Sequence, residues 1–564
     1  MGIDDKNLEI NIQALQQTIR AKNIEILRLR GSIRYQLGEA LVQAFRSPAL
    51  FVRLPARLWR IAKRATATRT FFKVSGALEC GLSAALPAHE AAYKYTDRAF
   101  ARDLAREVVD FAGQGSEQRI RCLQTSDPDL QAYHERALEM ATLVDKGVAL
   151  VEASLKCPFI PRPKTVLYAL HSSLPTSVNG YSIRSHSIIK GVSDHGWRVI
   201  PTVQEKTIIG VTKNSNGNFL VDGVSYLGLE DFKLPLSIEK TIFAYADAIE
   251  SAAISTRPAI LHAASNWTTG LATLIAARRL ALPFVYEVRG FWEITRTSIE
   301  PDYANSIGYA LQKKLETQVC CAADHLFTIS SSMRDELIHR GIERDKITLV
   351  PNGISTKSDR PKKGSGMPNP MINGSGPVIG FVGSITPYEG LDKMIQAVYQ
   401  LGKANIKARL LIVGDGPALA ELQTLTKQLA LSEAVVFTGK VTPEQARSAY
   451  DYIDIAAFIR PDTKIAQIVE PLKPLEAMAS GTSVLLSPVA PLLSLAAGGD
   501  RAVIVADHSM KSLVASLKQM IENPDMRDQL GKSARIWVCK NRNWSFITQP
   551  VPMIYSALIG ETSD

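Results

Sequence analysis

Residues 468–481 read Ile-Val-Glu-Pro-Leu-Lys-Pro-Leu-Glu-Ala-Met-Ala-Ser-Gly, a proline-rich turn followed by a run of small helix-forming residues. The free amides at a helix N-terminus attract anions, and Lys473 adds positive charge beside them. Glu476 stands one turn further on, where a carboxylate can bind ribose hydroxyls. A nucleotide-sugar presents a diphosphate and a ribose, so we interpret this stretch as a nucleotide-sugar site. A capped helix of an ordinary α/β protein is the alternative.

The composition describes a chain of several domains. At 564 residues the chain is too long for one hydrophobic core, so we expect two or three domains. No apolar run reaches the roughly 18 residues that a membrane-spanning helix needs, and the acidic start at residues 1–5 is unlike a signal peptide. The six cysteines have neither metal-ligand nor paired spacing, which favours a reduced, cytoplasmic protein.

The first 160 residues show the spacing of apolar and polar residues that is typical of helices. Apolar residues recur at alternating spacings of four and three from residue 8 to residue 33. This pattern predicts a coiled coil and hence a homo-oligomer, with one amphipathic helix lying on the protein body as the alternative. Residues 84–155 also follow a helical rhythm. We therefore divide this part into a coiled-coil and basic segment, 1–75, and a helical region, 76–160.

Residues 46–69 carry seven lysines and arginines without an acidic residue, interleaved with apolar side chains. This combination suits an anionic membrane surface and predicts a peripheral location at the inner face of the cell membrane. A solvated or intramolecular face is one alternative. Nucleic acid is another, but no base-reading motif accompanies the segment, so we expect no nucleic-acid partner.

From residue 161 the pattern changes to buried strands alternating with helices. Strands are expected at 165–170, 197–203, 259–262, 284–288, 324–330 and 347–350, and again at 378–382, 409–413, 434–438, 453–458 and 483–486. A polar Gly/Pro-rich linker, 356–376, separates the two series. The predicted fold is α/β, with two Rossmann-like domains, 161–355 and 377–540, facing a cleft, and a final helical segment, 541–564.

Six segments in the same order resemble those of retaining glycosyltransferases of family 4, which have the two-domain GT-B architecture. The resemblance covers about residues 165–550 and is closest to members associated with bacterial exopolysaccharide or surface-glycan synthesis. The segments are His171-Ser-Ser-Leu-Pro with Asn179-Gly-Tyr-Ser-Ile-Arg184, Tyr286-Glu-Val-Arg-Gly-Phe-Trp-Glu293, Val350-Pro-Asn-Gly-Ile354, Gly380-Phe-Val-Gly-Ser-Ile-Thr-Pro-Tyr-Glu-Gly390, Val413-Gly-Asp-Gly-Pro417 and the Pro-Leu-Lys-Pro-Leu-Glu-Ala-Met-Ala run.

The resemblance implies that the C-terminal half binds a UDP- or GDP-linked sugar and that the N-terminal half binds a glycan or lipid-linked acceptor. Glycines at strand ends let the backbone approach phosphates without Cβ obstruction; tight turns are the alternative. The family usually has Gly-Gly where this chain has Asn179-Gly180. The substrate-binding candidates in these segments are Asn179, Gly180, Gly383, Ser384, Gly414, Gly416, Leu472 and Glu476. Lys440 and Val441 are added because they follow the next strand, where the family binds the base of the nucleotide.

The catalytic cations depart from the family pattern. A nucleoside diphosphate leaving group needs positive charge where its own charge develops. Relatives supply an Arg and a Lys in the segment matching 384–389, whereas this chain has Ser384 and Glu389 there. We expect Arg460 and Lys473 to supply the missing charge, with Lys464 in reserve.

Two further departures concern carboxylates and histidines. The family places a second glutamate eight positions before Glu476, but this chain has Ile468, so Glu470 is the nearest candidate. Many relatives carry His-Ala-His where this chain has Ala264 in place of the second histidine. His262 is therefore expected in the core, and Ser265 and Asn266 could line the cleft.

The first domain offers three candidate groups after its strands. His171 follows the first strand, and Arg289 and Glu293 belong to a segment that faces the cleft in relatives. They are candidates for the acceptor or sugar side. A buried structural Arg–Glu pair is the alternative for the last two.

Together these features predict a retaining hexosyltransferase-type enzyme that uses protein cations, with no metal site and no cofactor. The departing phosphate oxygen would assist the acceptor hydroxyl on the same face. A nucleotide-sugar epimerase is one rival, which product analysis without acceptor would separate. The other is an inactive scaffold of the same fold, motivated by Ser384, Glu389, Ile468 and Ala264, which need not bind any nucleoside diphosphate.

Overall fold

The computed structural model describes residues 135, 138–145, 160–175, 177–203, 219–229, 237–355 and 375–561. The predicted coiled coil at 8–33, the basic segment 46–69, most of the helical region 76–160 and nearly all of the linker 356–376 lie outside these residues. Residues 138–145 are helical. Among the described helices, none is both long and apolar enough to cross a membrane.

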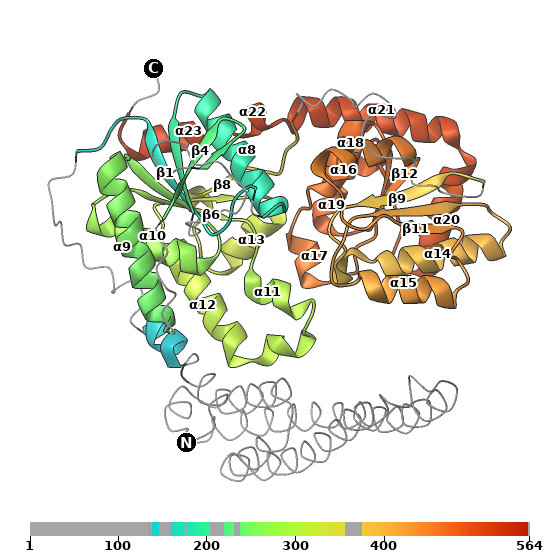
Figure 1. Cartoon of the computed structure of the whole chain (residues 1–564), viewed down its shortest axis with the longest axis horizontal. Helices are drawn as coiled ribbons and strands as arrows, with labels where there is room; N and C mark the ends of the chain where they lie inside the picture. Colours follow the sequence, from blue (N-terminus) through green and yellow to red (C-terminus); the bar gives the residue numbers. More distant parts are fainter. Residues whose placement is uncertain are drawn as a thin grey trace, which may run out of the picture. The chain divides into compact units, whose positions relative to one another are not determined.

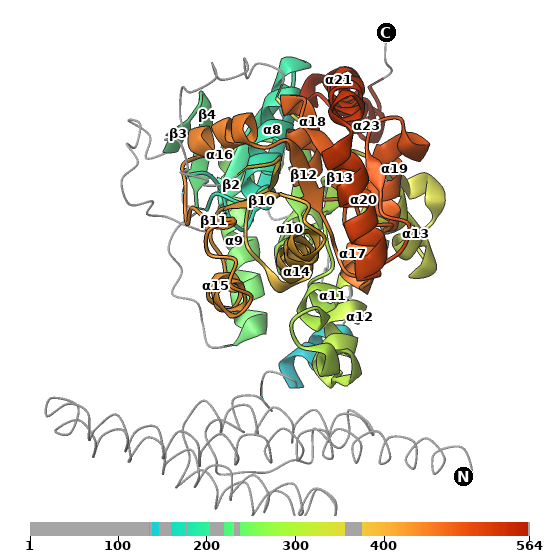
Figure 2. The same cartoon turned by 90° about the vertical axis from the view of Figure 1, so that its right-hand side faces the viewer.

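The described chain forms two compact units. The smaller unit includes residues 138–145, 237–239 and 302–314. In it, the backbone amide of Ile238 donates to Oε2 of Glu139 over 2.7 Å. The larger unit contains the two sheets formed by the described residues and the helices packed on them (Figures 1 and 2).

The first sheet has eight strands in the order β3-β4-β2-β1-β5-β6-β7-β8, all parallel except β3, which pairs antiparallel with β4. Helices cover both of its faces (Figure 1). The strands are β1 Thr165–Leu170, β2 Arg198–Val203, β3 Phe219–Val221, β4 Val224–Gly228, β5 Ile260–Ala264, β6 Phe284–Val288, β7 His325–Thr328 and β8 Ile347–Leu349. The helices are α8 Gly180–Asp194, α9 Ile238–Thr256, α10 Trp267–Arg279, α11 Trp292–Thr297, α12 Ile307–Ala322 and α13 Ser331–His339.

The second sheet has six parallel strands in the order β11-β10-β9-β12-β13-β14. They are β9 Val378–Val382, β10 Arg409–Val413, β11 Val435–Phe437, β12 Ile455–Phe458, β13 Ser483–Leu486 and β14 Val503–Ile504. The associated helices are α14 Leu391–Lys403, α15 Leu419–Gln428, α16 Pro443–Ala449, α17 Lys464–Ile468, α18 Lys473–Ser480, α19 Ala490–Ala496, α20 Met510–Glu522 and α21 Pro524–Asn541.

The continuous apolar strands explain this architecture. Every residue of β1, β5, β6 and β9 is buried, as expected for parallel strands covered by helices on both faces. The predicted fold class of two parallel-sheet α/β domains is confirmed. The β3–β4 hairpin was not predicted. It turns at Asp222 and Gly223, whose positive φ angles of 45° and 81° suit a tight hairpin turn.

The larger unit has two halves, one built around each sheet. The chain crosses from one half to the other at two adjacent places. Ile354 follows the first sheet. Its amide donates over 2.7 Å to the carbonyl of Arg542, the residue that follows α21. The amide of Trp544 donates back to the carbonyl of Ile354 over 3.2 Å. Helices α22 Trp544–Ile547 and α23 Pro550–Leu558 then return to the first sheet, where Tyr555 packs with Tyr168.

A buried carboxyl caps α10. Asn266 precedes this helix without capping it, and Oε2 of Glu316 accepts the amide of Trp267 over 2.9 Å instead. Oε1 of Glu316 accepts the hydroxyl of Tyr286 over 2.6 Å. Burial raises the pKa of Glu316 to about 7, against the opposing effect of the Tyr286 hydrogen bond.

This carboxyl should make stability depend on pH. The unfolded chain releases the proton near the ordinary pKa of 4.5, whereas the folded chain keeps it to about pH 7. The unfolded state therefore binds fewer protons in this window, and stability falls as pH rises from 4.5 to 7. We expect Glu316→Gln to remove this loss, worth roughly 2–3 kcal/mol.

The measurement is the melting temperature of wild type and Glu316→Gln at pH 5 and pH 8. The variant should gain several degrees on wild type between the two values. Glu300→Gln, an exposed partner of Arg296, is the control and should gain nothing. A Glu316→Gln difference that is the same at both pH values would contradict the buried, protonated carboxyl.

Candidate functional site

Lys473, Arg460 and Glu389 meet where the strand order of the second sheet reverses, between β9 and β12. Glu389 ends the short 3-10 helix Pro387–Glu389 after β9, Arg460 follows β12, and Lys473 begins α18. Oε1 of Glu389 lies 2.7 Å from Nζ of Lys473 and 3.1 Å from Nη2 of Arg460. Such a reversal is where open α/β sheets bind ligands. The two predicted cations therefore do converge there.

The charges at this point do not balance. Burial opposes ionisation of Glu389, but the charges of Arg460 and Lys473 outweigh it and hold the pKa of Glu389 below its ordinary value. One carboxylate thus faces two cations in a largely buried position. Nζ of Lys473 also donates to the carbonyl of Ser384 over 3.1 Å, while Ser384 itself is exposed. The cluster has a surplus positive charge beside a helix N-terminus, which suits an anionic ligand.

The glycines of this edge are required by close packing of neighbouring loops. A Cβ on Gly383, whose φ is 142°, would lie 2.3 Å from Cε of Lys473. One on Gly414 would lie 2.0 Å from the carbonyl oxygen of Gly383, and one on Gly416 would lie 2.3 Å from that of Ile385. The loops after β9 and β10 and the side chain of Lys473 therefore pack closely against one another. These glycines are needed for more than turning the chain.

The loop after β11 joins the same edge. Gly439 forms a bridge with Gly414, which brings this loop against the one after β10. Lys440 is exposed, and Val441 is half-buried against the second core. Lys464, the reserve cation, is half-exposed. Its Nζ lies 3.5 Å from Oε2 of Glu336, so it pairs with a different carboxylate from Lys473 and Arg460.

Asn179 and Gly180 start α8 next to the second half. The side chain of Asn179 accepts the amide of Ser182, and the Ser182 hydroxyl accepts the amide of Asn179, so Asn179 caps the helix. Gly180 is exposed, and a Cβ there would lie 3.4 Å from Cδ1 of Leu472. The N-terminus of α8 therefore lies beside the residue that precedes Lys473.

Glu476 lies in the first turn of α18. Burial would raise the pKa of its carboxyl to about 7, with Lys473 opposing, yet the residue is exposed. The carboxyl can therefore be reached from solvent. Its position allows contact with a ligand on α18.

Glu470 forms a buried ion pair with Arg542, and its catalytic role stays a prediction. Its two oxygens lie 2.8 and 3.0 Å from Nη1 and Nη2 of Arg542, and only 3% of the residue is exposed. Its carbonyl accepts Nδ2 of Asn352 over 2.8 Å. Glu470 thus links Asn352 and Arg542, which lie in the two segments where the chain crosses between the halves. Ile468, where the family has glutamate, is buried, and its carbonyl accepts the Ser330 hydroxyl.

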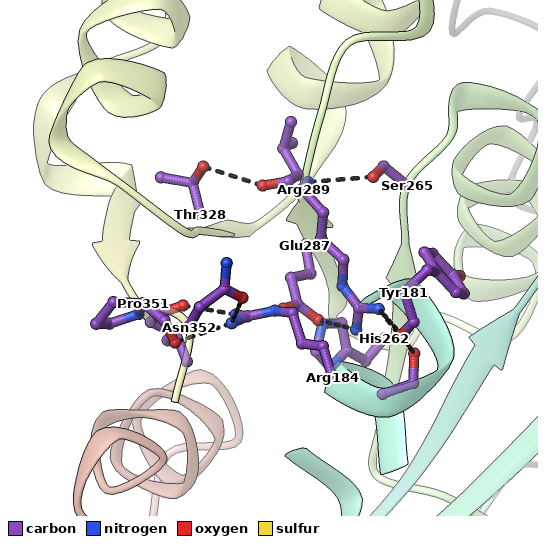
Figure 3. A network of polar contacts seen from close by, with 12 residues as sticks. Tyr181, Arg184, His262, Ser265, Glu287, Arg289, Thr328, Pro351 and Asn352 are labelled. Carbon is purple, nitrogen blue, oxygen red and sulfur yellow. Dashed lines mark hydrogen bonds and ion pairs between the residues drawn. The ribbon is translucent and has the colours of Figure 1, made fainter. Parts of the chain in front are cut away.

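Arg289 belongs to a buried network centred on Glu287 (Figure 3). Its Nη2 lies 2.7 Å from Oε2 of Glu287, and its Nη1 donates to the Ser185 hydroxyl over 2.7 Å. Arg184 lies 2.7 Å from Oε1 of the same carboxylate and donates to the carbonyls of Pro351 and Val350. Burial opposes ionisation of Glu287, but both guanidinium groups together hold its pKa well below the ordinary value.

Glu293 also forms a buried ion pair, and its substrate-binding role stays a prediction. Its Oε1 lies 2.8 Å from Nη2 of Arg340, and both side chains are almost fully buried. The structural alternative, a buried Arg–Glu pair, is therefore what the fold contains. The partners differ from those considered, because Arg289 pairs with Glu287 and Glu293 pairs with Arg340.

His171 follows β1 at the other topological reversal, between β1 and β5. Its ring lies 3.9 Å from that of Tyr181, and its Nδ1 has no hydrogen-bond partner. Burial lowers its pKa to about 4, with a further contribution from Arg289. Ser265 and Asn266 follow β5 and are buried rather than lining an open surface. His262 lies in the core as predicted, 2.6 Å from the Tyr555 hydroxyl.

Two family descriptions match the chain in the same order as its two sheets. Residues 180–353 match "Glycosyl transferase 4-like domain", and residues 367–537 match "Glycosyl transferases group 1". Together they cover more than half of the chain. The chain belongs to the group 1 glycosyltransferases.

Curated glycosyltransferases are similar over the same part of the chain. An uncharacterized glycosyltransferase of Methanocaldococcus jannaschii is 24% identical over 274 residues, 46% of this chain and 65% of that protein. The D-inositol 3-phosphate glycosyltransferase of Streptomyces coelicolor is 23% identical over 372 residues, 60% of this chain and 77% of that protein. The first match thus spans slightly less than two thirds of its relative.

Solved glycosyltransferase structures share the fold. Sucrose-phosphate synthase of Thermosynechococcus elongatus has a TM-score of 0.56 at 16% identity, covering 71% of this chain and 100% of that chain. HepE of Anabaena has a TM-score of 0.53 at 14% identity, covering 70% and 99%. The two parallel-sheet domains are therefore those of a GT-B glycosyltransferase.

The sequence analysis did not identify the buried charged network around Glu287. Glu287 stands in the strand Phe-Val-Tyr-Glu-Val, which is otherwise apolar except for the tyrosine hydroxyl. A carboxylate in a fully buried strand requires a cationic partner. That rule could have identified Glu287 as a network centre, with Arg289 two residues away. Nothing local indicated Arg184 as its second partner. Among the described residues, no group of three or more His, Cys, Asp or Glu is placed to hold a metal ion.

Proposed function

We propose that this chain transfers a hexosyl group from a nucleoside-diphosphate sugar to an acceptor hydroxyl, with retention at the anomeric carbon. The observation that carries the proposal is the convergence of Lys473 and Arg460 on one carboxylate at the N-terminus of α18. A nucleoside diphosphate would present its charge to these cations. Glu476, exposed one turn further on, would accept the ribose hydroxyls.

The cations would act on the leaving group. As the bond between the anomeric carbon and the phosphate oxygen breaks, negative charge grows on that oxygen. Lys473 and Arg460 lie close enough together to stabilise it without a metal ion, and this supports metal-independent transfer. The acceptor oxygen would bond to the anomeric carbon from the same face. Its proton would pass to the departing phosphate oxygen, which keeps the charges balanced.

The comparisons support a nucleotide-sugar donor. HepE of Anabaena, which shares the fold, is described in complex with UDP and with glucose, so a UDP-linked sugar is the first donor to examine. The acceptor would be a glycan or a lipid-linked sugar, of the kind used in exopolysaccharide assembly. Residues 46–69 would hold the enzyme at a membrane surface, and the heptads at 8–33 would pair its subunits.

The proposal is tested by calorimetric titration of the full chain with UDP, GDP and ADP, with and without a chelator. One of the three should bind at micromolar concentration, and chelation should leave both binding and turnover of the matching sugar nucleotide unchanged. Binding of none would favour the inactive scaffold. Activity that requires a divalent cation would refute the metal-independent step.

Glu389 should weaken diphosphate binding, because its charge competes for the two cations. Glu389→Gln keeps an oxygen that can accept from Lys473 and Arg460 but removes the negative charge. We expect the Kd for UDP, or for whichever diphosphate binds, to fall by about tenfold, or ~1.4 kcal/mol. Titration of Glu522→Gln, an exposed partner of Lys518, is the control. Weaker binding by Glu389→Gln would mean that the carboxylate positions the cations rather than competing for them.

A further inference from the structure

The turn that leads to Lys473 is held from outside at three consecutive carbonyls. Residues 468–472, which we call the lysine turn, join the end of α17 to Lys473 at the start of α18. The donors are Ser330 to the carbonyl of Ile468 over 2.8 Å, Arg460 to that of Val469 over 3.2 Å and Asn352 to that of Glu470 over 2.8 Å. Two of these three donors belong to the first half, so the first half helps to fix a turn of the second.

Glu470 is held at its side chain as well as at its carbonyl. Its two oxygens accept from Nη1 and Nη2 of Arg542 over 2.8 and 3.0 Å. Nη1 of Arg542 also donates to the carbonyl of Asn352 over 3.0 Å. We call Asn352 and Arg542 the crossing clamp, because each lies where the chain crosses between the halves. A two-pronged guanidinium–carboxylate pair fixes direction as well as distance, so the clamp sets the orientation of Glu470.

The clamp is anchored in the core of the first half (Figure 3). Nη1 of Arg184 donates to Oδ1 of Asn352 over 3.1 Å, and Nη2 of Arg184 lies 2.7 Å from Oε1 of Glu287. The amide group of Asn352 is therefore bonded on both sides, by Arg184 at its oxygen and to Glu470 at its nitrogen. Asn352 is only 4% exposed. The position of Glu470 thus depends on the charged network around Glu287.

The sequence between Glu470 and the start of α18 is stiff. It reads Glu470-Pro471-Leu472-Lys473-Pro474, with two prolines in five residues. Each proline ring fixes its own φ near −65°. The segment therefore has few free dihedral angles to absorb a displacement of Glu470. A shift of Glu470 would be passed on to Lys473, whose Nζ lies 2.7 Å from Oε1 of Glu389.

We infer that Asn352 and Arg542 are positioning residues for sugar transfer, which place the Lys473 ammonium beside the departing phosphate oxygen by holding Glu470. Neither residue of the clamp would touch the substrate. The inference rests on the proposed function, because it concerns the same charge on the leaving group. Positioning of this kind has large effects, since a displacement of about 1 Å can cost roughly 10²-fold in rate.

The test is a double-mutant cycle between Arg542 and Lys473. It measures kcat/KM for the nucleotide-sugar that wild type consumes, in full-length wild type, Arg542→Gln, Lys473→Ala and the double variant. We expect Arg542→Gln to lower kcat/KM about tenfold in the wild-type background. In the Lys473→Ala background its effect should be less than about twofold, because residues that act through one another are not additive. Arg542→Lys, which keeps the charge, should recover part of the loss.

Arg501→Gln is the matched control. The guanidinium groups of Arg501 and Arg542 lie 3.9 and 5.5 Å from the same Trp537 ring. Arg501 donates to the carbonyls of Leu495 and Ser494 and has no printed bond to the lysine turn. Its replacement should change kcat/KM less than about twofold in either background. A loss equal to that of Arg542→Gln would show a general effect of removing positive charge and would overturn the inference.

The outcomes separate this inference from the proposed function. A tenfold loss by Arg542→Gln in both backgrounds, or no loss in either, overturns the clamp and leaves the donor assignment standing. Full activity of Lys473→Ala, or a wild type that consumes no nucleotide-sugar, overturns the proposed function and this inference with it. Melting temperatures establish that each variant is folded. If Arg542→Gln does not fold, Glu470→Gln/Arg542→Gln replaces it in the same cycle, because that pair leaves no buried charge without a partner.

Discussion

Replacing Lys473 by alanine should lower kcat/KM for sugar transfer by about 10²–10³-fold, the loss typical of removing one group that stabilises a developing oxyanion. Nζ of Lys473 lies 2.7 Å from Glu389, at the end of a side chain that is 18% exposed. Without it, Arg460 would face Glu389 alone and the surplus positive charge would disappear. The measurement is the initial rate of nucleotide-sugar turnover with saturating acceptor.

Lys464→Ala is the matched control. Lys464 is 49% exposed and contacts Glu336, not Glu389, so its removal should change kcat/KM less than threefold, an effect of about 0.6 kcal/mol. If Lys464→Ala lost as much activity as Lys473→Ala, the reserve lysine would be the catalytic cation. If neither variant lost activity, the cation cluster would have no part in the reaction.

Replacing Arg184 by alanine should destabilise the protein by about 3–5 kcal/mol, the usual cost of leaving a buried charge with one partner fewer. Arg184 is 2% exposed and bonds to Glu287, to the carbonyls of Val350 and Pro351, and to the side chain of Asn352. These bonds connect the core of the first sheet with the crossing to the second half. The melting temperature should fall by many degrees.

Arg278→Ala provides the comparison. Arg278 makes a two-pronged pair with Asp324, but their side chains are 29% and 35% exposed. Pairs that remain partly in water contribute little, so its loss should cost about 1 kcal/mol or less. Equal melting temperatures for the two variants would show that the network around Glu287 does not stabilise the fold.

The strands were predictable because burial on both faces leaves an unbroken apolar run. β1, β6, β9, β10 and β13 begin and end at the predicted residues. The β3–β4 hairpin was missed, although Asp222-Gly223 is a turn signal, because a short hairpin beside a long parallel sheet has no strong periodicity. His171 and Glu389 lie at the points where the strand order of their sheets reverses. These reversals depend on which distant strands pair, so no local sequence pattern predicts them.

The site residues could be proposed from the sequence, but the partners of their side chains could not. Lys473 and Arg460 were chosen for their charge, and their meeting at Glu389 needs the fold. Glu470 and Glu293 were chosen for their place in the chain, but their partners Arg542 and Arg340 are distant in sequence. Side-chain direction at a strand or helix end depends on such distant partners. Carboxylates close to a ligand site along the chain can therefore serve the scaffold.

The most direct test of the account is nucleotide-sugar turnover by Lys473→Ala/Glu476→Ala, compared with wild type, over a panel of UDP-, GDP- and ADP-linked hexoses. Circular dichroism and the melting temperature would establish that the double variant is folded. The account predicts that wild type consumes one donor of the panel and that the folded double variant loses this turnover by at least about 10³-fold. Undiminished turnover in the folded double variant would contradict it.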